Sequence, residues 1–144
     1  DRNGLRNAAQ IKLWQHYLDG LFGVPPSQAL ILGTGNLDPV DGEGRHPAIQ
    51  SLLADPRLQD PAPSSPGGAA VANPDHKGDP ARDTVDGWEE DDGPGNLRVD
   101  YVLPTANLTG TAAGVQWSAP QTQEAERQAT ASRHRLVWVD IALP

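Results

Sequence analysis

The chain has 144 residues, a formal net charge of −8 and no Cys. This length is enough for one domain with a hydrophobic core, and the lack of Cys excludes disulfides, thiolate metal sites and a Cys nucleophile. A strongly acidic surface repels phosphate backbones, which argues against a protein that coats nucleic acid. The chain contains 15 Gly and 14 Pro, a density that predicts long irregular connections rather than a helical bundle.

The sequence also lacks Met, even at position 1, which predicts that it is a piece of a longer polypeptide. No apolar run approaches the ~20 residues that a membrane-spanning helix needs, so no membrane span is expected. The composition leaves the compartment open, with an extracytoplasmic or secreted bacterial location favoured.

The first part of the chain predicts two helices around one strand. Residues 5–22 carry apolar side chains such as Ile11 and Trp14 at three- and four-residue steps, the period of an amphipathic helix. The apolar run 28–33 predicts a buried strand. Residues 47–54 predict a short helix with Pro in its first turn.

Residues 61–95 differ from the rest of the chain in composition. They contain six Pro, six Gly, eight acidic residues and only two basic ones, so most of the net charge lies here. Such a segment has little apolar surface to bury. It therefore predicts a long acidic loop on the surface of a single domain that spans residues 1–144.

The last part of the chain predicts strands. Residues 98–103 alternate, which puts Val99, Tyr101 and Leu103 on one face and Asp100 on the other. Further strands are expected at 113–118 and 136–143, with a helix or helical turn at 121–132. The irregular alternation of helices and strands predicts an α+β fold, with a mixed-sheet layer flanked by helices.

Three segments each join an apolar strand to a cluster of polar residues: Gly33-Thr-Gly-Asn-Leu-Asp-Pro39, Arg98-Val-Asp-Tyr-Val-Leu103 and Ser132-Arg-His-Arg-Leu-Val137. In this order and at these separations, they resemble the last three signature blocks of the endonuclease/exonuclease/phosphatase superfamily, which has the deoxyribonuclease I-like fold. The resemblance covers only the C-terminal half of that fold. It implies that residues 1–144 are the C-terminal half of a four-layer αββα sandwich.

The resemblance implies catalytic roles for His134, Asp100 and Asn36. His134 matches the histidine that holds the scissile phosphate, and Asp100 matches the carboxylate that fixes the tautomer of this histidine. Asn36 matches the amide that orients the attacking water or the phosphate. A carboxylate beside an imidazole stabilises its charged form, which suits a phosphate clamp. The alternative interpretation is that His134 caps a strand and Asp100 pairs with Arg98 or another surface group.

Two positions depart from the family pattern. Thr34 stands where the family has the Asp that activates the attacking water, and a hydroxyl cannot accept that proton at neutral pH. Arg133 stands where the family has a carboxylate that helps to hold the metal, and its permanent positive charge repels Mg²⁺. Thr34 and Arg133 are therefore assigned to substrate binding, Arg133 through direct contact with phosphate. The metal ligands within the chain are unknown.

The resemblance implies part of a metal-dependent phosphoesterase that hydrolyses phosphodiester or phosphomonoester bonds. Its cofactor would be Mg²⁺ or Mn²⁺, with Ca²⁺ as an alternative, held largely by the missing N-terminal half. The alternative function, favoured by Thr34 and Arg133, is a non-catalytic phosphate-binding member of the same fold. Nucleic acid stays open as a substrate class, although the acidic charge disfavours it.

Half of a sandwich would also leave the inner face of one sheet without its partner. That face needs the missing N-terminal half or a second chain, whether a cleaved piece or another copy. Its expected residues are Leu30, Leu32, Val99, Tyr101 and Val137.

Two other patterns have ordinary interpretations. Gly33-Thr-Gly-Asn36 follows a strand like a dinucleotide-binding loop, but the third Gly and the βαβ unit are missing. Asp38, Asp41 and Glu43 suggest either a Ca²⁺ site or a solvated turn, and their spacing favours the turn.

Overall fold

The structure is a computed structural model that describes residues 2–87 and 93–142, and it has an α+β fold. The helices are α1 (Arg2–Leu18), α2 (His46–Leu53), α3 (Pro66–Ala70), α4 (Gln123–Ala131) and the short 3₁₀ helix η1 (Pro80–Arg82). The strands are β1 (Leu30–Thr34), β2 (Asp100–Pro104), β3 (Thr109–Val115) and β4 (Val137–Ala142). In the described parts of the chain, no helix combines the length and apolar character that a membrane crossing requires.

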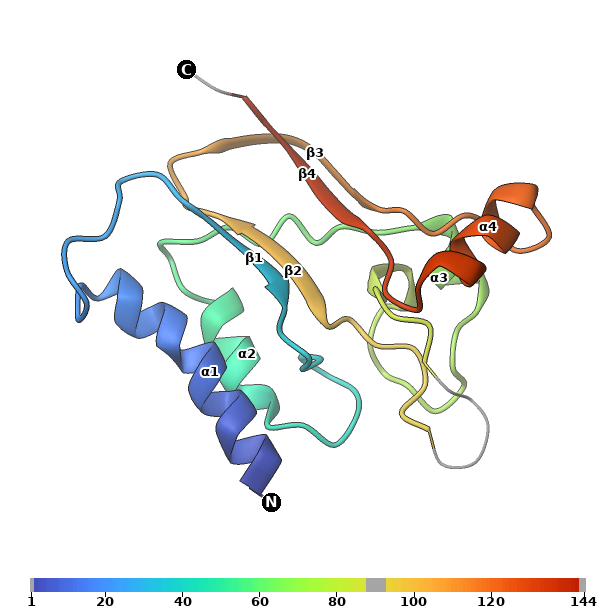
Figure 1. Cartoon of the computed structure of the whole chain (residues 1–144), viewed down its shortest axis with the longest axis horizontal. Helices are drawn as coiled ribbons and strands as arrows, with labels where there is room; N and C mark the ends of the chain where they lie inside the picture. Colours follow the sequence, from blue (N-terminus) through green and yellow to red (C-terminus); the bar gives the residue numbers. More distant parts are fainter. Residues whose placement is uncertain (1, 88–92, 143–144) are drawn as a thin grey trace.

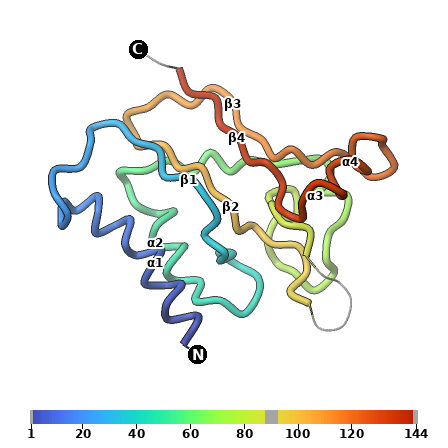
Figure 2. The backbone as a smooth tube through the Cα atoms, viewed as in Figure 1, coloured from blue at the N-terminus to red at the C-terminus, as the bar shows by residue number. Residues whose placement is uncertain are grey.

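The described strands form two antiparallel ladders. β1 pairs with β2, with Thr34 opposite Asp100, and β3 pairs with β4. β4 also contacts β2, and Figures 1 and 2 show the two ladders one above the other, with α1 and α2 beside the β1–β2 ladder. The mixed sheet that the sequence predicts is absent from the described residues. Alternating helices and strands do not fix strand direction, and in this chain each long connection returns the chain antiparallel.

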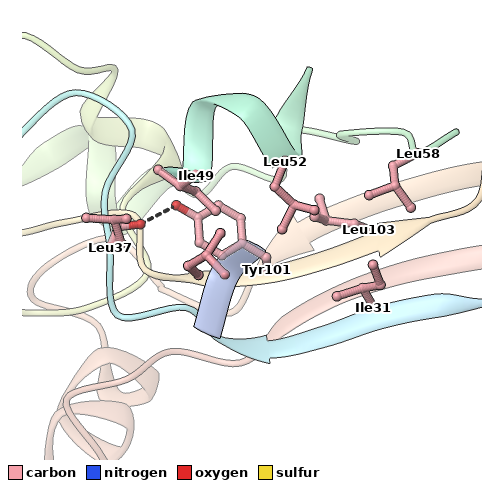
Figure 3. Packing of buried hydrophobic residues seen from close by; sticks show 8 residues of the cluster. Ile31, Leu37, Ile49, Leu52, Leu58, Tyr101 and Leu103 are labelled. Carbon is pink, nitrogen blue, oxygen red and sulfur yellow. Dashed lines mark hydrogen bonds between the residues drawn. The ribbon is translucent and has the colours of Figure 1, made fainter. Parts of the chain in front are cut away.

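The hydrophobic core lies between the β1–β2 ladder and helices α1 and α2. Its buried members are Ile11, Ile31, Leu37, Ile49, Leu52, Leu58, Tyr101 and Leu103. Figure 3 shows Ile49 and Leu52 of α2 packed over Tyr101 and Leu103 of β2. The predicted alternation of β2 is therefore confirmed, because Tyr101 and Leu103 are buried while Asp100 lies on the opposite face.

The prediction of a fully buried β1 is wrong, because only Ile31 of this strand is buried. Leu30 and Leu32 are 45% and 63% exposed, on the face that also carries Thr34. An apolar run alone does not tell whether both faces of a strand are covered. The predicted open face is also corrected at Val99 and Tyr101, which are buried within the chain itself.

The acidic segment 61–95 is more structured than a surface loop. It contains α3 and η1, and it buries Ser65 and the whole of Thr84. Gly67 fits against Trp117 because a Cβ at this position would lie 2.2 Å from the indole ring. Small and polar residues thus pack here through hydrogen bonds and close backbone contacts rather than through apolar area. Trp88 and acidic residues 89–92, which belong to the predicted loop, lie outside the described residues.

The Tyr101 hydroxyl is the main polar contact of the core, since it lies 2.8 Å from the carbonyl oxygens of Leu37 and Arg98. We expect Tyr101→Phe to lower the free energy of unfolding by about 1 to 2 kcal/mol, because the two buried carbonyls lose the one hydroxyl proton that they share. Urea unfolding measures this change. Tyr17→Phe is the matched control on α1, and an equal loss in both variants would contradict the assignment.

Candidate functional site

The structure brings together three of the five predicted site residues. His134 Nδ1 lies 2.9 Å from Asp100 Oδ2 and 3.2 Å from Asp100 Oδ1. The His134 side chain is 47% exposed and that of Asp100 is 13% exposed. Since a carboxylate only accepts hydrogen bonds, this geometry requires a proton on Nδ1 and leaves Nε2 directed away from Asp100. The pair therefore offers one ring nitrogen to solvent or to a ligand.

Thr34, the third of these residues, is bound to the same carboxylate. Its hydroxyl donates to Asp100 Oδ1 at 2.5 Å across the β1–β2 ladder, where the two residues are directly opposite. The hydroxyl proton is thus used within the protein. Thr34 helps to orient Asp100, which is a different role from the substrate contact expected from the sequence.

Thr84 completes the shell of Asp100, and sequence reasoning missed it. This fully buried residue donates its hydroxyl proton to Asp100 Oδ2 at 2.9 Å. The oxygen of the same hydroxyl accepts the backbone N–H groups of Val99 and Asp100, both at 3.0 Å. One hydroxyl therefore fixes both the backbone and the carboxylate of Asp100. No residue pattern in segment 61–95 pointed to this role.

Thr84 belongs to residues 84–86, here called the bridge segment, which join the two halves of the site. Val85 forms antiparallel bridges with Leu97 on one side and with His134 on the other. The carbonyl of Thr84 accepts from Arg135 N at 2.8 Å, and Asp86 N donates to the carbonyl of Arg133 at 3.0 Å. The bridge segment thus sets the spacing between the strand of Asp100 and the loop of His134.

Arg135 holds the loop of His134 from the buried side. Its guanidinium donates to the carbonyls of Gln128 and Ser132, both at 2.9 Å, and to Asp86 Oδ2 at 2.7 Å. It also lies over the Trp117 ring, 4.8 Å from the centroid. A buried arginine with these partners ties α4 to the bridge segment, so it supports the position of His134 without contacting its ring. The sequence signal was weak, since Arg135 appears only as the residue after His134.

Asn36 and Arg133 are not brought to the Asp100–His134 pair by any hydrogen bond in the described part of the chain. Asn36 is exposed, has a positive φ of 48°, and donates its backbone N–H to the carbonyl of Val99. With Thr34 it lines a cavity of about 250 Å³ beside α1. Arg133 lines a separate cavity of about 630 Å³ next to α4.

The alternative pairing of Asp100 with Arg98 is not observed. Arg98 instead forms two hydrogen bonds with Asp60, at 2.8 and 2.5 Å, and lies over the Tyr101 ring. Burial works to raise the pKa of Asp60, but the hydrogen bonds and charge of Arg98 hold this pKa below its ordinary value. The charge of Arg98 is therefore neutralised by Asp60 inside the fold, and Asp100 pairs with His134 instead.

The described residues do not form a metal site. No group of three or more His, Cys, Asp or Glu side chains among residues 2–87 and 93–142 is arranged to hold a metal ion. Asp38 is buried, and its carboxylate accepts from the backbone N–H groups of Val40, Asp41 and Arg98. Asp41 accepts from the N–H groups of Lys77 and Gly78. Both carboxylates fix loops, so the expected solvated turn is corrected at Asp38 and Asp41, while Glu43 is exposed as expected.

Comparisons with known protein families, with curated proteins and with solved structures find no match to the chain. An imidazole fixed by a carboxylate can donate or accept a proton at Nε2, or bind an anion when it is protonated. The hydroxyls of Thr34 and Thr84 hold the Asp100 carboxylate in place during these reactions of the ring.

We expect Thr84→Val to lower the free energy of unfolding by about 1 to 3 kcal/mol, because Val99 N–H, Asp100 N–H and the carboxylate all lose a buried partner. Thr84→Ser keeps the hydroxyl and should recover most of this loss. The exposed Thr111 of β3 provides the control, Thr111→Val, which should change stability by less than about 0.5 kcal/mol. Equal effects of the Val and Ser variants at position 84 would contradict the assigned role of the hydroxyl.

Proposed function

We propose that the chain is part of a phosphoesterase that hydrolyses phosphodiester or phosphomonoester bonds. The observation that supports this proposal best is the contact of His134 with Asp100, at 2.9 Å, inside a shell of two threonine hydroxyls. These residues belong to the second and third segments that resemble the endonuclease/exonuclease/phosphatase superfamily. Their approach across a separation of 34 residues in sequence supports a shared site.

In this proposal, the His134 ring holds the scissile phosphate through Nε2. Asp100 keeps the proton on Nδ1 and stabilises the positive charge of the ring as negative charge develops on the phosphate. Thr84 and Thr34 keep the carboxylate from turning away from the ring. His134 is more exposed than Asp100, which suits a group that meets substrate while its support stays inside the protein.

We also propose that this chain forms the C-terminal half of a four-layer αββα sandwich. Leu30 and Leu32 of β1 share the exposed face that carries Thr34, and Leu136 and Trp138 are also exposed on or next to β4. An apolar sheet face of this kind needs a covering layer. We propose that the N-terminal half of the fold covers it, with a second chain as the alternative partner.

A divalent cation does not fit the described residues of this chain. Arg133 stands where the superfamily has a carboxylate that helps to hold the metal, and no group of three or more His, Cys, Asp or Glu side chains among the described residues is arranged to hold one. A cation such as Mg²⁺ or Mn²⁺ therefore enters the proposal only as a group held by the N-terminal half, and the roles of His134 and Asp100 do not depend on it.

A second candidate function is phosphate binding without turnover by a protein of the same fold. The hydrogen bond that Thr34 donates to Asp100 favours it, because the residue at the expected position of the water-activating group is neutral and already engaged. In this function, His134 would bind phosphate and no bond would be broken, while Arg133, which lines a separate cavity, would contribute its charge from nearby.

Hydrolysis of bis(4-nitrophenyl) phosphate by the full-length protein, with Mg²⁺ or Mn²⁺ added or chelated, separates the two functions. For the phosphoesterase we expect His134→Ala to lower the rate by about 10²- to 10³-fold, the usual cost of removing one group that stabilises developing charge. Thr34→Asp restores a base but removes the hydroxyl that donates to Asp100, so it should raise the rate only if the missing base costs more than the lost hydrogen bond. His16→Ala on α1 is the matched control and should leave the rate unchanged.

Turnover that is equal in the protein and in His134→Ala would contradict the role of the pair. If neither the protein nor Thr34→Asp turns over, while inorganic phosphate binds and His134→Ala or Arg133→Ala weakens that binding, the second function is the correct one. Calorimetry with inorganic phosphate measures this binding directly.

A further inference from the structure

Asp83 directly precedes Thr84 and is one of the most buried carboxylates of the chain. The residue is only 8% exposed, and its backbone N–H donates to the carbonyl of Pro80. Within the described residues, no N–H or O–H group donates a hydrogen bond to its carboxylate. It lines a cavity of about 80 Å³ together with Asp38 and Asp79. An ionised carboxylate in such a position lacks the partners that normally offset its burial.

The charges that face Asp83 make ionisation still less favourable. Three carboxylates act on it: Asp38 and Asp41 from the loop after β1, and Asp79 from the cap of η1. Each of these accepts backbone N–H groups of nearby loops, so each is held in its present position. Burial first, and then these three charges, raise the pKa of Asp83 to about 7.

Arg98 and Arg82 line the same cavity as Asp83, and His76 and Lys77 lie beside Asp41. Arg98 lines the same cavity but is bonded to Asp60 through both of its terminal nitrogens. Arg82 lies with its Nε 3.5 Å from Asp79 Oδ2. His76 has its Nδ1 4.0 Å from Asp41 Oδ2, and Lys77 contacts Asp41 through its backbone N–H. Among the described residues, the ion pairs of Arg98, Arg82 and His76 are with Asp60, Asp79 and Asp41, and none is with Asp83.

We propose that Asp83 is a proton-dependent latch for the bridge segment, closed when its carboxyl group is protonated and released when it ionises. Release would loosen Thr84, and Thr84 holds both the backbone and the carboxylate of Asp100. Protonation of Asp83 would thus control how firmly the Asp100–His134 pair is held in place, although Asp83 contacts neither the His134 ring nor substrate. This inference goes beyond the proposed phosphoesterase and does not depend on any catalytic activity.

The sign of the effect follows from linkage. A carboxyl group whose pKa is higher in the folded state than in the unfolded state binds a proton on folding, so it favours the fold at low pH. The ordinary pKa of this carboxyl is 3.8 and its folded pKa is about 7. Stability should therefore fall as the pH rises between these two values and then level off.

Carbon NMR of protein labelled at the Asp carboxyl carbons tests the first half of the proposal. We expect the Asp83 signal, assigned through its backbone, to titrate with a midpoint near 7, well above the ordinary value for aspartate. This measurement needs no variant, so it decides the point even if a variant does not fold. A midpoint for Asp83 below about 5 would overturn the proposal.

Hydrogen exchange of the Val99 and Asp100 amides tests the second half, because both donate to Thr84. Between about pH 5 and about pH 8 we expect their protection factors to fall by about tenfold or more, beyond the change in intrinsic exchange rate. Asp83→Asn mimics the protonated form and should remove this fall, while Asp75→Asn, an exposed position in the same segment, should keep it.

Protection that is independent of pH in the unmodified protein, or that falls equally in Asp83→Asn, would overturn the latch. Added Ca²⁺ provides a further control. If millimolar Ca²⁺ restores protection at about pH 8 and does so only when Asp83 is present, a cation rather than a proton neutralises the carboxylates, and the proposal fails.

Discussion

The hydroxyl of Thr84 is the contact on which the arrangement of the site depends. It accepts two backbone N–H groups and donates to the carboxylate of Asp100, so it joins the bridge segment to the start of β2. Through Val85, the same segment pairs with His134. Because a fully buried hydroxyl has no water to replace lost partners, the loss of any one of these bonds is costly. The Asp100–His134 pair is therefore held by the bridge segment, which connects the two ladders, and not by pairing within one sheet.

The parts of the fold that depend on local pattern were predictable from the sequence. The two-residue alternation of β2 gave the correct faces for Tyr101 and Asp100, and the helical period and a proline located α1 and α2 near their true bounds. The predictions for β2, α1 and α2 rest on periodicity and on residue type, both of which are properties of a short stretch of chain. The expectation that Asp100 and His134 share a site came instead from the resemblance of three segments to a known superfamily, and the structure places the two residues in contact.

The parts that depend on distant contacts were not predictable. Thr84 and Asp83 lie in a segment rich in Pro, Gly and acid, where composition suggests only a loop, and their roles arise from residues far along the chain. Strand direction and the exposure of Leu32 likewise depend on what lies across the sheet. Thr34 was expected to meet substrate, and only its register with Asp100 reveals that its proton is already shared within the protein.

Asp100 fixes the tautomer of His134 by accepting the proton of Nδ1. Nitrogen NMR of the histidine rings tests this role, since it identifies which ring nitrogen carries the proton in the neutral form. We expect a proton on Nδ1 of His134 in the unmodified protein and a shift of the proton towards Nε2 in Asp100→Ala. The same tautomer in both proteins would show that Asp100 does not set it.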